Sequence, residues 1–559
     1  MSVTQFEIRA GAYFDSVVLM QLQRELAALP GVVDAGIVMA TPANRELLTG
    51  SDLLPPAASQ TSPDDLLIVV KAVDAAAAQS ALSQLDSLIQ QRRAATAQSF
   101  RPRSLATAAR LLPTAAWVLV SVPGRYAADV ARTALEAGKN IFLYSDNVPL
   151  EEELVLKRQA SEAGLLLLGP DCGTAIINGV GLGFANRVRR GAIGLVGATG
   201  TGLQAITSRI HALGAGVSQA IGIGGRDLSL EVGGITALQA LDLLRRDPDT
   251  DVIVLVSKPP APEVAARLLA AALHAGKPVI VYFMGYPPTL GRLDGRLMIV
   301  SSLEDAAQQA VHCLNQARPL ATDDTSPASG YVRGLFSGGT LAYELMLAWQ
   351  GVLFPLYSNV PLRPTQALPQ VTHSQGHTIL DMGADEFTQG RLHPMLDNTL
   401  RLRRLRQEAA DTEVGLIVLD VVLGEGAHPD PAAELAPAIA AVKAQRPVEV
   451  AVLLVGTDAD PQGFSIQAER LAAAGAVVYY EISALVEVVA QRWGQQTAAT
   501  FTPVPLAILQ KPLAAINIGL ESFYDTLTAQ GAAAVHVEWR PPAGGNERMM
   551  GLLAQLKRK

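Results

Sequence analysis

Short aliphatic runs alternate with helix-forming segments through most of this chain, and this alternation limits the possible folds more than any other feature. Between residues 100 and 190 the strand-like runs are "AAWVLVSV", "NIFLYSD" and "LLLLGPD", separated by the helical segments "YAADVARTALEAG" and "EEELVLKRQASEAG". Such alternation is typical of βαβ units, whose parallel sheets bind ligands at the carboxyl ends of the strands. We therefore expect a doubly wound α/β fold with ligand contacts in the loops 121–126, 145–148 and 169–174.

The same alternation divides the chain into predicted parts, of which the third and fourth look like divergent copies. The predicted ranges are 1–95 (small α+β domain), 100–190 (Rossmann-like domain), 191–318 and 330–495 (two flavodoxin-like domains) and 505–559 (short α/β C-terminal segment). Within the first domain we expect strands at 6–10, 32–40 and 65–73 and helices at 16–29, 44–48 and 75–92, with an exposed loop at 51–65. Aromatic residues in the C-terminal segment predict that it docks on a partner domain or subunit.

Both predicted copies open with a strand, a cluster of Gly, Ser and Thr, and a helix. The two stretches are "AIGLVGATGTGLQAITSRI" (192–210) and "GLFSGGTLAYELMLAW" (334–349). A helix that begins directly after such a turn presents unpaired backbone N–H groups and the positive end of its dipole. The candidate anion-binding residues are therefore Thr199, Gly200, Thr201, Gly202, Ser337, Gly338, Gly339 and Thr340.

Composition excludes several classes of function. The 559 residues carry a net charge of -8, and no dense run of Lys or Arg suggests nucleic-acid binding. The apolar runs are too short to span a membrane, and the N-terminus lacks the apolar core of a signal peptide, so we expect a cytosolic protein. The two cysteines, Cys172 and Cys313, predict neither disulfides nor a zinc site. We expect no metal and no certain cofactor.

Several motifs occur in the order found in a known enzyme family. They are "GPDC" (169–172), "IGLVGATGTGLQA" (193–205), "AIGIGGRD" (220–227) and "LLRRDPDTDVIVLV" (243–256). On these motifs, residues 115–312 resemble the α subunit of succinyl-CoA ligase. With "TPANRELL" (41–48), "EVGG" (231–234), "GRLHPMLD" (390–397) and "PPAGGNERMMGLL" (541–553), the whole chain resembles the FdrA family of ligase-like proteins.

The resemblance implies a fold, a ligand and a mechanism. Succinyl-CoA ligases bind CoA on the Rossmann-like domain and pass a phosphoryl group through a histidine held between two helix N-termini, one from each ligase domain. Here the two Gly-rich turns would be that helix pair. The residues matched to the CoA loops are Pro123, Asn147, Gly169 and Pro170.

The chain departs from the ligase pattern at three places. Where the family has its phosphohistidine, this chain reads "YPPTLGRLDGRLMIV" (286–300), without histidine. Where the family has the glutamate that holds the histidine, this chain reads "VSKPP", which places Ser257 or Lys258 there. The Gly-rich first loop of the CoA domain is also missing, because residues 1–95 form a different kind of domain. Without a nucleophile, this route cannot activate a carboxylate from nucleotide.

What remains is an anion site suited to a free phosphate or to a preformed acyl or carbamoyl phosphate. The FdrA resemblance implies a subunit of an oxamate carbamoyltransferase in purine-nitrogen catabolism, acting with other protein subunits on carbamoyl phosphate and oxamate or oxalurate. In this interpretation Arg226 binds phosphate or carboxylate, and Lys258 adds positive charge. Two alternatives are an acyl-CoA synthetase of the ADP-forming type, with CoA as ligand, and a non-catalytic regulatory subunit that binds a phosphorylated metabolite.

The segment "DMGADEFTQGRLHP" supplies further candidates. The candidates are Asp381, Asp385, Glu386 and His393. They would supply an acid/base pair, bind a divalent cation, or provide a substitute phosphohistidine at His393. The alternative without a function is that these residues cap loops and form turns. Asp381 and His393 are the catalytic candidates retained. His373 and His377 are four residues apart but follow a polar loop, which does not favour a metal pair. Cys172 is interpreted as a structural residue.

Overall fold

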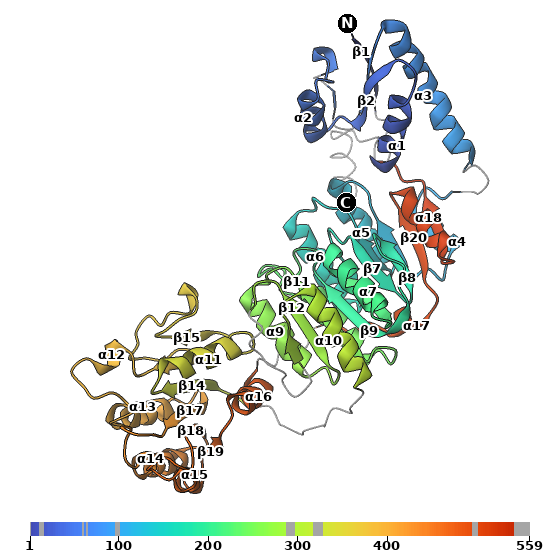
Figure 1. Cartoon of the computed structure of the whole chain (residues 1–559). Helices are drawn as coiled ribbons and strands as arrows, with labels where there is room; N and C mark the ends of the chain where they lie inside the picture. The colour runs from blue at the N-terminus through green and yellow to red at the C-terminus, as the bar shows by residue number, and fades with distance from the viewer. Residues whose placement is uncertain are drawn as a thin grey trace, which may run out of the picture. The chain divides into compact units, whose positions relative to one another are not determined.

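The computed structural model describes residues 2–10, 16–58, 61–62, 65–95, 101–286, 297–316, 328–494 and 501–541. The chain divides into two compact units (Figure 1). Unit 1 consists of Met1–Glu152 together with Pro512–Lys559, and unit 2 consists of Glu153–Lys511. Both ends of the chain therefore contribute to unit 1. No helix in the described ranges combines the length and the apolar character needed to cross a bilayer.

The N-terminal part of unit 1 is a three-stranded antiparallel sheet in the order β1-β3-β2 with helices between the strands. Its elements are β1 (Val3–Arg9), α1 (Ser16–Ala27), β2 (Val32–Met39), α2 (Pro42–Gly50), β3 (Leu66–Ala72) and α3 (Ala75–Ala95). Successive side chains of a strand point to opposite faces, and here both faces of β3 are buried. Ile68 and Val70 join a core with α1 and α3, whereas Leu67 and Val69 join a second core on the other face.

That second core corrects in part the prediction of an exposed loop at 51–65: Ser51, Asp52, Pro56 and Ala57 are exposed, but two apolar side chains of the loop are not. Leu53 is 4% exposed and Ala58 is fully buried, and both pack with Leu67 and Val69. Because the central strand is apolar on both faces, its second face needs a cover, which α2 and this loop supply. Residues 59–60 and 63–64 lie outside the described ranges.

The rest of unit 1 is a parallel sheet in which the strand order is β21-β20-β4-β5. Its elements are α4 (Leu105–Leu111), β4 (Trp117–Val120), α5 (Gly124–Glu136), β5 (Asn140–Leu143), β20 (Ala514–Ile518), α18 (Glu521–Ala529) and β21 (Ala533–Val537). The C-terminal segment thus supplies two strands, and β20 pairs directly with β4 (Ile516 with Val118). From β4 the chain crosses to β5 on one side, and from β20 it crosses to β21 on the other. The ends of β4 and β20 therefore form a topological switch point, where such sheets bind ligands.

Unit 2 contains a seven-stranded sheet in the order β13-β12-β11-β9-β10-β7-β8. Strands β9 to β13 are parallel, and β7 and β8 extend the sheet as antiparallel strands. Strands β7 and β8 fall within the predicted Rossmann-like range, 100–190, but pair with this sheet. The elements of this part of the chain are α6 (Leu150–Glu162, at whose start unit 2 begins), β6 (Leu167–Leu168, which is not one of the seven strands), β7 (Thr174–Ile177), β8 (Val180–Gly183), β9 (Arg190–Gly197), α7 (Gly200–Ala212), β10 (Val217–Gly222), α8 (Ile235–Arg246), β11 (Val252–Ser257), α9 (Pro262–Leu273), β12 (Val279–Phe283), β13 (Leu297–Ile299) and α10 (Leu303–Asn315).

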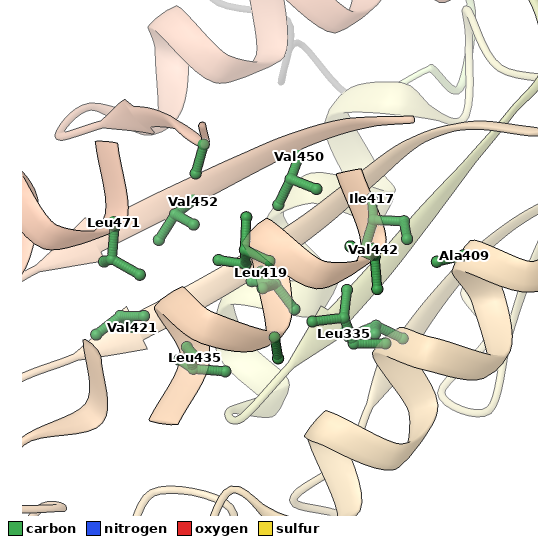
Figure 2. Packing of buried hydrophobic residues seen from close by; sticks show 14 of the residues in the cluster. Leu335, Ala409, Ile417, Leu419, Val421, Leu435, Val442, Val450, Val452 and Leu471 are labelled. Carbon is green, nitrogen blue, oxygen red and sulfur yellow. The ribbon is translucent and has the colours of Figure 1, made fainter. Parts of the chain in front are cut away.

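A six-stranded, entirely parallel sheet follows in the order β15-β16-β14-β17-β18-β19. Its elements are β14 (Tyr331–Phe336), α11 (Gly339–Trp349), β15 (Leu356–Ser358), β16 (His377–Asp381), α12 (Asp385–Thr388), α13 (Thr399–Ala410), β17 (Val414–Val422), α14 (Pro431–Gln445), β18 (Glu449–Val455), α15 (Phe464–Ala473), β19 (Val477–Tyr479) and α16 (Ile482–Trp493), with α17 (Ala507–Gln510) beyond it. Figure 2 shows one of its cores, in which Leu335, Ile417, Leu419, Val450 and Val452 of the strands pack against Ala409, Leu435, Val442 and Leu471 of α13, α14 and α15.

Both sheets of unit 2 place their opening strand in the interior of the sheet. Strand β9 lies between β10 and β11, and β14 lies between β16 and β17. Each opening strand is followed by a helix, α7 or α11, that starts at the carboxyl edge of its sheet. The predicted doubly wound α/β fold is confirmed, and each Gly-rich turn lies at a switch point.

Candidate functional site

The first Gly-rich turn joins β9 to α7. Thr199 is the N-cap residue, in extended conformation, and its Oγ1 accepts a hydrogen bond from the N–H of Gly202 at 3.3 Å. A Cβ placed on Gly200 would lie 3.2 Å from Oγ1 of Thr174. The first turn of α7 has no acidic residue, so the positive end of the helix dipole is not compensated there. We call Thr199–Gly202 the α7 site.

Lys258 lies on the same edge of the sheet as the α7 site. It follows β11, which pairs with β9 up to the match of Val256 with Gly197. Its side chain is exposed, whereas the preceding Ser257 is buried. The sheet register therefore places Lys258 at the edge of the sheet where α7 begins, and contact of its ammonium with a ligand there stays a prediction.

Arg226 has a different environment from the one expected. Its Nη2 lies 2.8 Å from Oε2 of Glu153, a carboxylate that is fully buried, while the arginine side chain is 46% exposed. Burial raises the pKa of Glu153, and the charges of Lys157 and Arg226 oppose that rise. The guanidinium of Arg226 thus serves first as the counter-ion of a buried carboxylate, and its role toward a ligand stays a prediction.

The buried charges around Glu153 hold the loop before α8. Lys157 donates a hydrogen bond to the carbonyl of Ile223 at 3.0 Å and forms an ion pair with Asp227. Asp227 in turn accepts hydrogen bonds from the N–H groups of Thr236 and Ala237, at 3.2 and 2.9 Å, and so caps α8. This ion network fixes the "GIGGRD" turn.

The "GPDC" loop packs against that turn. Gly224 has a φ of +86°, and a Cβ on it would collide with the carbonyl oxygen of Pro170 and approach Gly169. Burial raises the pKa of the Cys172 thiol to about 12, so this thiol stays protonated near neutral pH. The result supports the structural interpretation of Cys172.

In unit 1, the predicted ligand loops after β4 and β5 lie together. Ser145 donates a hydrogen bond from Oγ to the carbonyl of Val122 at 2.6 Å. A Cβ on Gly124, next to Pro123, would collide with the carbonyl of Asp146 and approach that of Asn147. The sheet therefore places Pro123 and Asn147 in adjoining loops, and binding of a ligand by them stays a prediction.

A third strand-turn-helix at this edge was not singled out from the sequence. The N–H of Leu520 donates to Oγ of Ser121 at 2.8 Å. Gly519 has a φ of +120°, and a Cβ on it would lie 2.5 Å from the same Oγ. The sequence signal is the stretch "AINIGLES" (515–522), an apolar run followed by glycine and a helix start. This stretch is far from β4 in the sequence, since Leu520 follows Ser121 by 399 positions.

The second Gly-rich turn joins β14 to α11, and a buried network holds it in place. Ser337 donates to Asp420 twice, from its N–H to Oδ1 and from its Oγ to Oδ2, both at 2.8 Å. Arg401 forms an ion pair with Asp420 at 3.0 Å, and burial lowers the pKa of this arginine. The hydroxyl of Ser337 therefore has a structural partner. Sequence reasoning missed Asp420 and Arg401, although a charge inside "VGLIVLDVV" was a usable signal.

Asp381 ends β16 and lies beside the first residue of α11. A Cβ on Gly339 would be 2.8 Å from Oδ2 of Asp381, and Oδ1 accepts the N–H of Gly383 at 2.9 Å. Asp381 is 8% exposed. Burial raises its pKa, the hydrogen bond from Gly383 and the charge of His393 oppose the rise, and Asp420 and Glu386 add to it. Within the described ranges, no hydrogen bond or ion pair reaches Oδ2.

His393 approaches the same place from the segment after α12. Its Nδ1 accepts the N–H of Met395 at 3.2 Å. A Cβ on Gly383 would lie 2.7 Å from Nε2 of His393 and 3.2 Å from Oδ1 of Asp381. Because Nδ1 is an acceptor, the proton of the neutral ring is on Nε2, which is then a donor and not a nucleophile. This geometry argues against a substitute phosphohistidine. We call Ser337–Thr340 with Asp381 and His393 the α11 site.

The structure thus brings together most of the candidates from the fourth predicted part but separates others. His377 is buried, accepts the N–H of Val332 at 3.0 Å, and has its pKa lowered to about 3 by burial. Glu386 contacts Asn359, which also holds the backbone of Asp381. In the described part of the chain, no group of three or more His, Cys, Asp or Glu residues is arranged to hold a metal ion. The stretches 287–296 and 542–553 of two quoted motifs lie outside the described ranges.

Three families match parts of the chain. Residues 1–103 match the family described as AllF, heavy metal-associated domain; residues 188–285 match a CoA binding domain; and residues 335–488 match CoA-ligase. The CoA-binding match lies mainly on the seven-stranded sheet, beyond the predicted Rossmann-like range of 100–190. Residues 1–103 contain neither cysteine nor histidine, so they offer no thiolate or imidazole ligand to a heavy-metal ion.

One relative matches most of the chain, and several CoA ligase subunits match about a third of it. The uncharacterized protein YahF of Escherichia coli is 42% identical over 492 residues, which is 84% of this chain and 95% of YahF. Subunit alpha 1 of the ADP-forming succinate–CoA ligase of Archaeoglobus fulgidus is 29% identical over 183 residues, 32% of this chain and 60% of that subunit. Malate–CoA ligase subunit alpha of Methylorubrum extorquens is 26% identical over 193 residues, which is 33% of this chain and 64% of that subunit. Among solved structures, an acetyl-coenzyme A synthetase of Ca. Korarchaeum cryptofilum is 16% identical and has a TM-score of 0.29. The match covers 67% of this chain and 82% of the synthetase chain.

Proposed function

Because the chain belongs to the FdrA-type family that includes YahF, built on the scaffold of the succinyl-CoA ligase α subunit, we propose that it is the phosphate-binding subunit of an oxamate carbamoyltransferase. The enzyme would move a carbamoyl group between phosphate and the amide nitrogen of oxamate. Its partners would be further protein subunits. The cytosolic location expected from the sequence is part of this proposal.

The observation that carries the proposal has two parts. The chain keeps the helix start that would bind an anion, but it lacks the histidine that relays the phosphoryl group in the ligases. The α7 site keeps its capped helix start and has Lys258 on the same edge. The segment that holds the phosphohistidine in the ligases has no histidine here, and Nδ1 of His393 accepts a backbone N–H, which places the proton of the neutral ring on Nε2. A ligand that arrives already activated, such as carbamoyl phosphate, needs charge stabilisation from the protein and no phosphorylated side chain.

The proposed chemistry balances with the groups present. The amide nitrogen of oxamate attacks the carbamoyl carbon, the bond from that carbon to the phosphate oxygen breaks, and phosphate leaves while the nitrogen loses a proton. Backbone N–H groups at the α7 site and the ammonium of Lys258 would stabilise the charge that develops on the leaving phosphate. The reverse reaction would cleave oxalurate with phosphate. Convergence of the α7 and α11 sites on one reaction centre is part of the proposal.

Titration calorimetry of the full chain tests this function, with carbamoyl phosphate, inorganic phosphate and CoA as parallel ligands. We expect carbamoyl phosphate and phosphate to bind and to compete. Lys258→Met should weaken both, while Lys511→Met, which alters a distant lysine, is the matched control. Binding of CoA without carbamoyl phosphate would overturn the proposal.

The second candidate function is an acid–thiol ligase, an acyl-CoA synthetase of the ADP-forming type. The observation in its favour is the switch point in unit 1, where the loops of Pro123 and Asn147 adjoin and β20 lies beside β4. It requires a phosphoryl carrier outside the segments matched here. CoA affinity together with nucleotide-dependent thioester formation would establish this candidate instead. Ligand binding without turnover, even with partner subunits present, would indicate the regulatory alternative.

A further inference from the structure

Two turns at the carboxyl edges of the two sheets of unit 2 meet at one pair of side chains. Tyr286 follows β12 of the seven-stranded sheet, and Arg363 follows β15 of the six-stranded sheet. The Cζ atom of Arg363 lies 5.7 Å from the centroid of the Tyr286 ring, which is a cation–π distance. Neither side chain is among the candidate site residues named above.

Each of these turns is anchored close to one of the two helix-start sites. The turn after β12 is bonded to the end of β11, because the N–H of Met284 donates to the carbonyl of Ser257 at 3.0 Å. The loop after β15 is bonded to the end of β16, because the N–H of Asp381 donates to Asn359 at 2.9 Å. The pair therefore links the edge at which α7 begins to the edge at which α11 begins.

The hydroxyl of Tyr286 is buried and has no hydrogen-bond partner in the described part of the chain. Its ring packs edge-on against Phe283, with centroids 5.7 Å apart, which restricts the direction of the hydroxyl. Burial raises the pKa of this hydroxyl and the charge of Arg363 opposes the rise, so the phenol is protonated near neutral pH and can donate. A buried O–H without an acceptor is costly unless a ligand supplies one.

The guanidinium of Arg363 adds a positive charge to the same place. Arg363 is partly buried, and within the described ranges no Asp or Glu forms an ion pair with it. The pair thus offers N–H and O–H donors and a single positive charge. A carboxylate matches this set, because a guanidinium binds its two oxygens side by side and balances its one negative charge. A phosphate dianion would keep an uncompensated charge in a partly buried position.

We propose that Tyr286 and Arg363 bind a carboxylate group, with its oxygens on the guanidinium and on the phenol O–H. Because the two residues come from different sheets, the bound carboxylate bridges the two sheets of unit 2. The site uses no helix N-terminus and is separate from the α7 and α11 sites. The inference goes beyond the proposed function, which gives neither residue a role.

Titration calorimetry of the full chain tests the inference, with pyruvate as the carboxylate probe and inorganic phosphate as the second arm. We expect Tyr286→Phe to weaken pyruvate binding by roughly ten-fold, since a hydrogen bond to a charged group is lost. Arg363→Gln should abolish it, and Arg363→Lys should retain part of it, because lysine keeps the charge without the planar fork. Tyr480→Phe and Arg403→Gln, at exposed positions, are the matched controls.

Stability separates a ligand-binding phenol from a structural one. Because the hydroxyl has no partner in the described part of the chain, Tyr286→Phe without ligand should be at least as stable as the unmodified chain in urea denaturation. Pyruvate should raise the thermal midpoint of the unmodified chain more than that of Tyr286→Phe. A clear loss of stability in Tyr286→Phe would show that the hydroxyl has a structural partner and would overturn the inference.

The remaining outcomes also decide. Absence of pyruvate binding, or unchanged pyruvate affinity in Tyr286→Phe, would overturn the inference, and so would a phosphate affinity that exceeds that of pyruvate and falls in the same variants. If Arg363→Gln is unfolded, Tyr286→Phe still decides. Pyruvate binding through this pair without carbamoyl phosphate binding would uphold the inference and reject the proposed function. Carbamoyl phosphate binding without pyruvate binding would do the reverse.

Discussion

Replacing Gly339 by alanine is the sharpest structural test of the α11 site. The added Cβ would lie 2.8 Å from Oδ2 of Asp381, whereas such contacts are normally at least about 3.4 Å, so Asp381 must shift by roughly half an ångström. Moving it weakens the hydrogen bond from Gly383 to Oδ1, a loss of about 1 kcal/mol. Alanine in place of glycine at a helical position recovers about 0.5–1 kcal/mol. The two effects nearly cancel, so stability should change by less than about 1 kcal/mol.

Ligand binding should respond much more strongly than stability. We expect Gly339→Ala to weaken carbamoyl phosphate binding by roughly ten-fold, the equivalent of about 1.4 kcal/mol, because the added methyl group and the displaced carboxylate narrow the helix start at the proposed reaction centre. Gly338→Ala is the matched control, since a Cβ on Gly338 would meet no atom within 4 Å. Calorimetry measures binding and urea denaturation measures stability. Unchanged carbamoyl phosphate affinity in Gly339→Ala, or an equal loss in Gly338→Ala, would refute the reasoning.

Three further predictions concern other parts of unit 2. Lys258→Met should lower carbamoyl phosphate affinity a few-fold at low salt and by less at high salt, because salt screens this exposed charge. A loss of affinity that is equally large at every salt concentration would contradict this prediction. The pKa of His377 is lowered from 6.5 to about 3, so the unfolded chain binds the proton more readily and stability should fall by about 2 kcal/mol between pH 7 and pH 5. Urea denaturation at both pH values should show that His377→Gln flattens this dependence, and an equally steep slope in the variant would reject it. A thiol reagent at pH 8 should label Cys313 but not Cys172 in the native chain, and mass spectrometry that finds Cys172 modified would contradict its burial.

Local pattern predicted the elements of this protein well. The expected helix at 75–92 appears as α3 (Ala75–Ala95), and the expected strand at 32–40 appears as β2 (Val32–Met39). Both Gly-rich turns begin helices where the sequence placed them, at Gly200 and Gly339. These features depend on the spacing of apolar residues and on the conformational freedom of glycine, which are readable along the chain.

Pairings between distant segments were predicted less well. Arg226 was expected to face a ligand, but its ion-pair partner is Glu153 of α6, which precedes it by 73 positions. The C-terminal segment was expected to dock on a partner domain or subunit, but the manner of docking was not predicted: β20 is hydrogen-bonded to β4 within a sheet. The tautomer of His393 depends on one backbone N–H, that of Met395. None of these partners can be identified from periodicity, because a strand or a charge is compatible with many neighbours.

The sequence by itself determined the doubly wound α/β class, the two helix starts and the loss of the relay histidine, since each is a matter of residue identity and local spacing. The tertiary structure alone decided which charges meet at those helix starts. Thr199–Gly202 and Ser337–Thr340 look like equivalent anion sites in the sequence. Only the order of strands places the carboxylate of Asp381 beside Gly339, because β16 lies next to β14 in the sheet. Electrostatic interactions fall off with distance in space and not along the chain, so the difference between the two sites exists only in the fold.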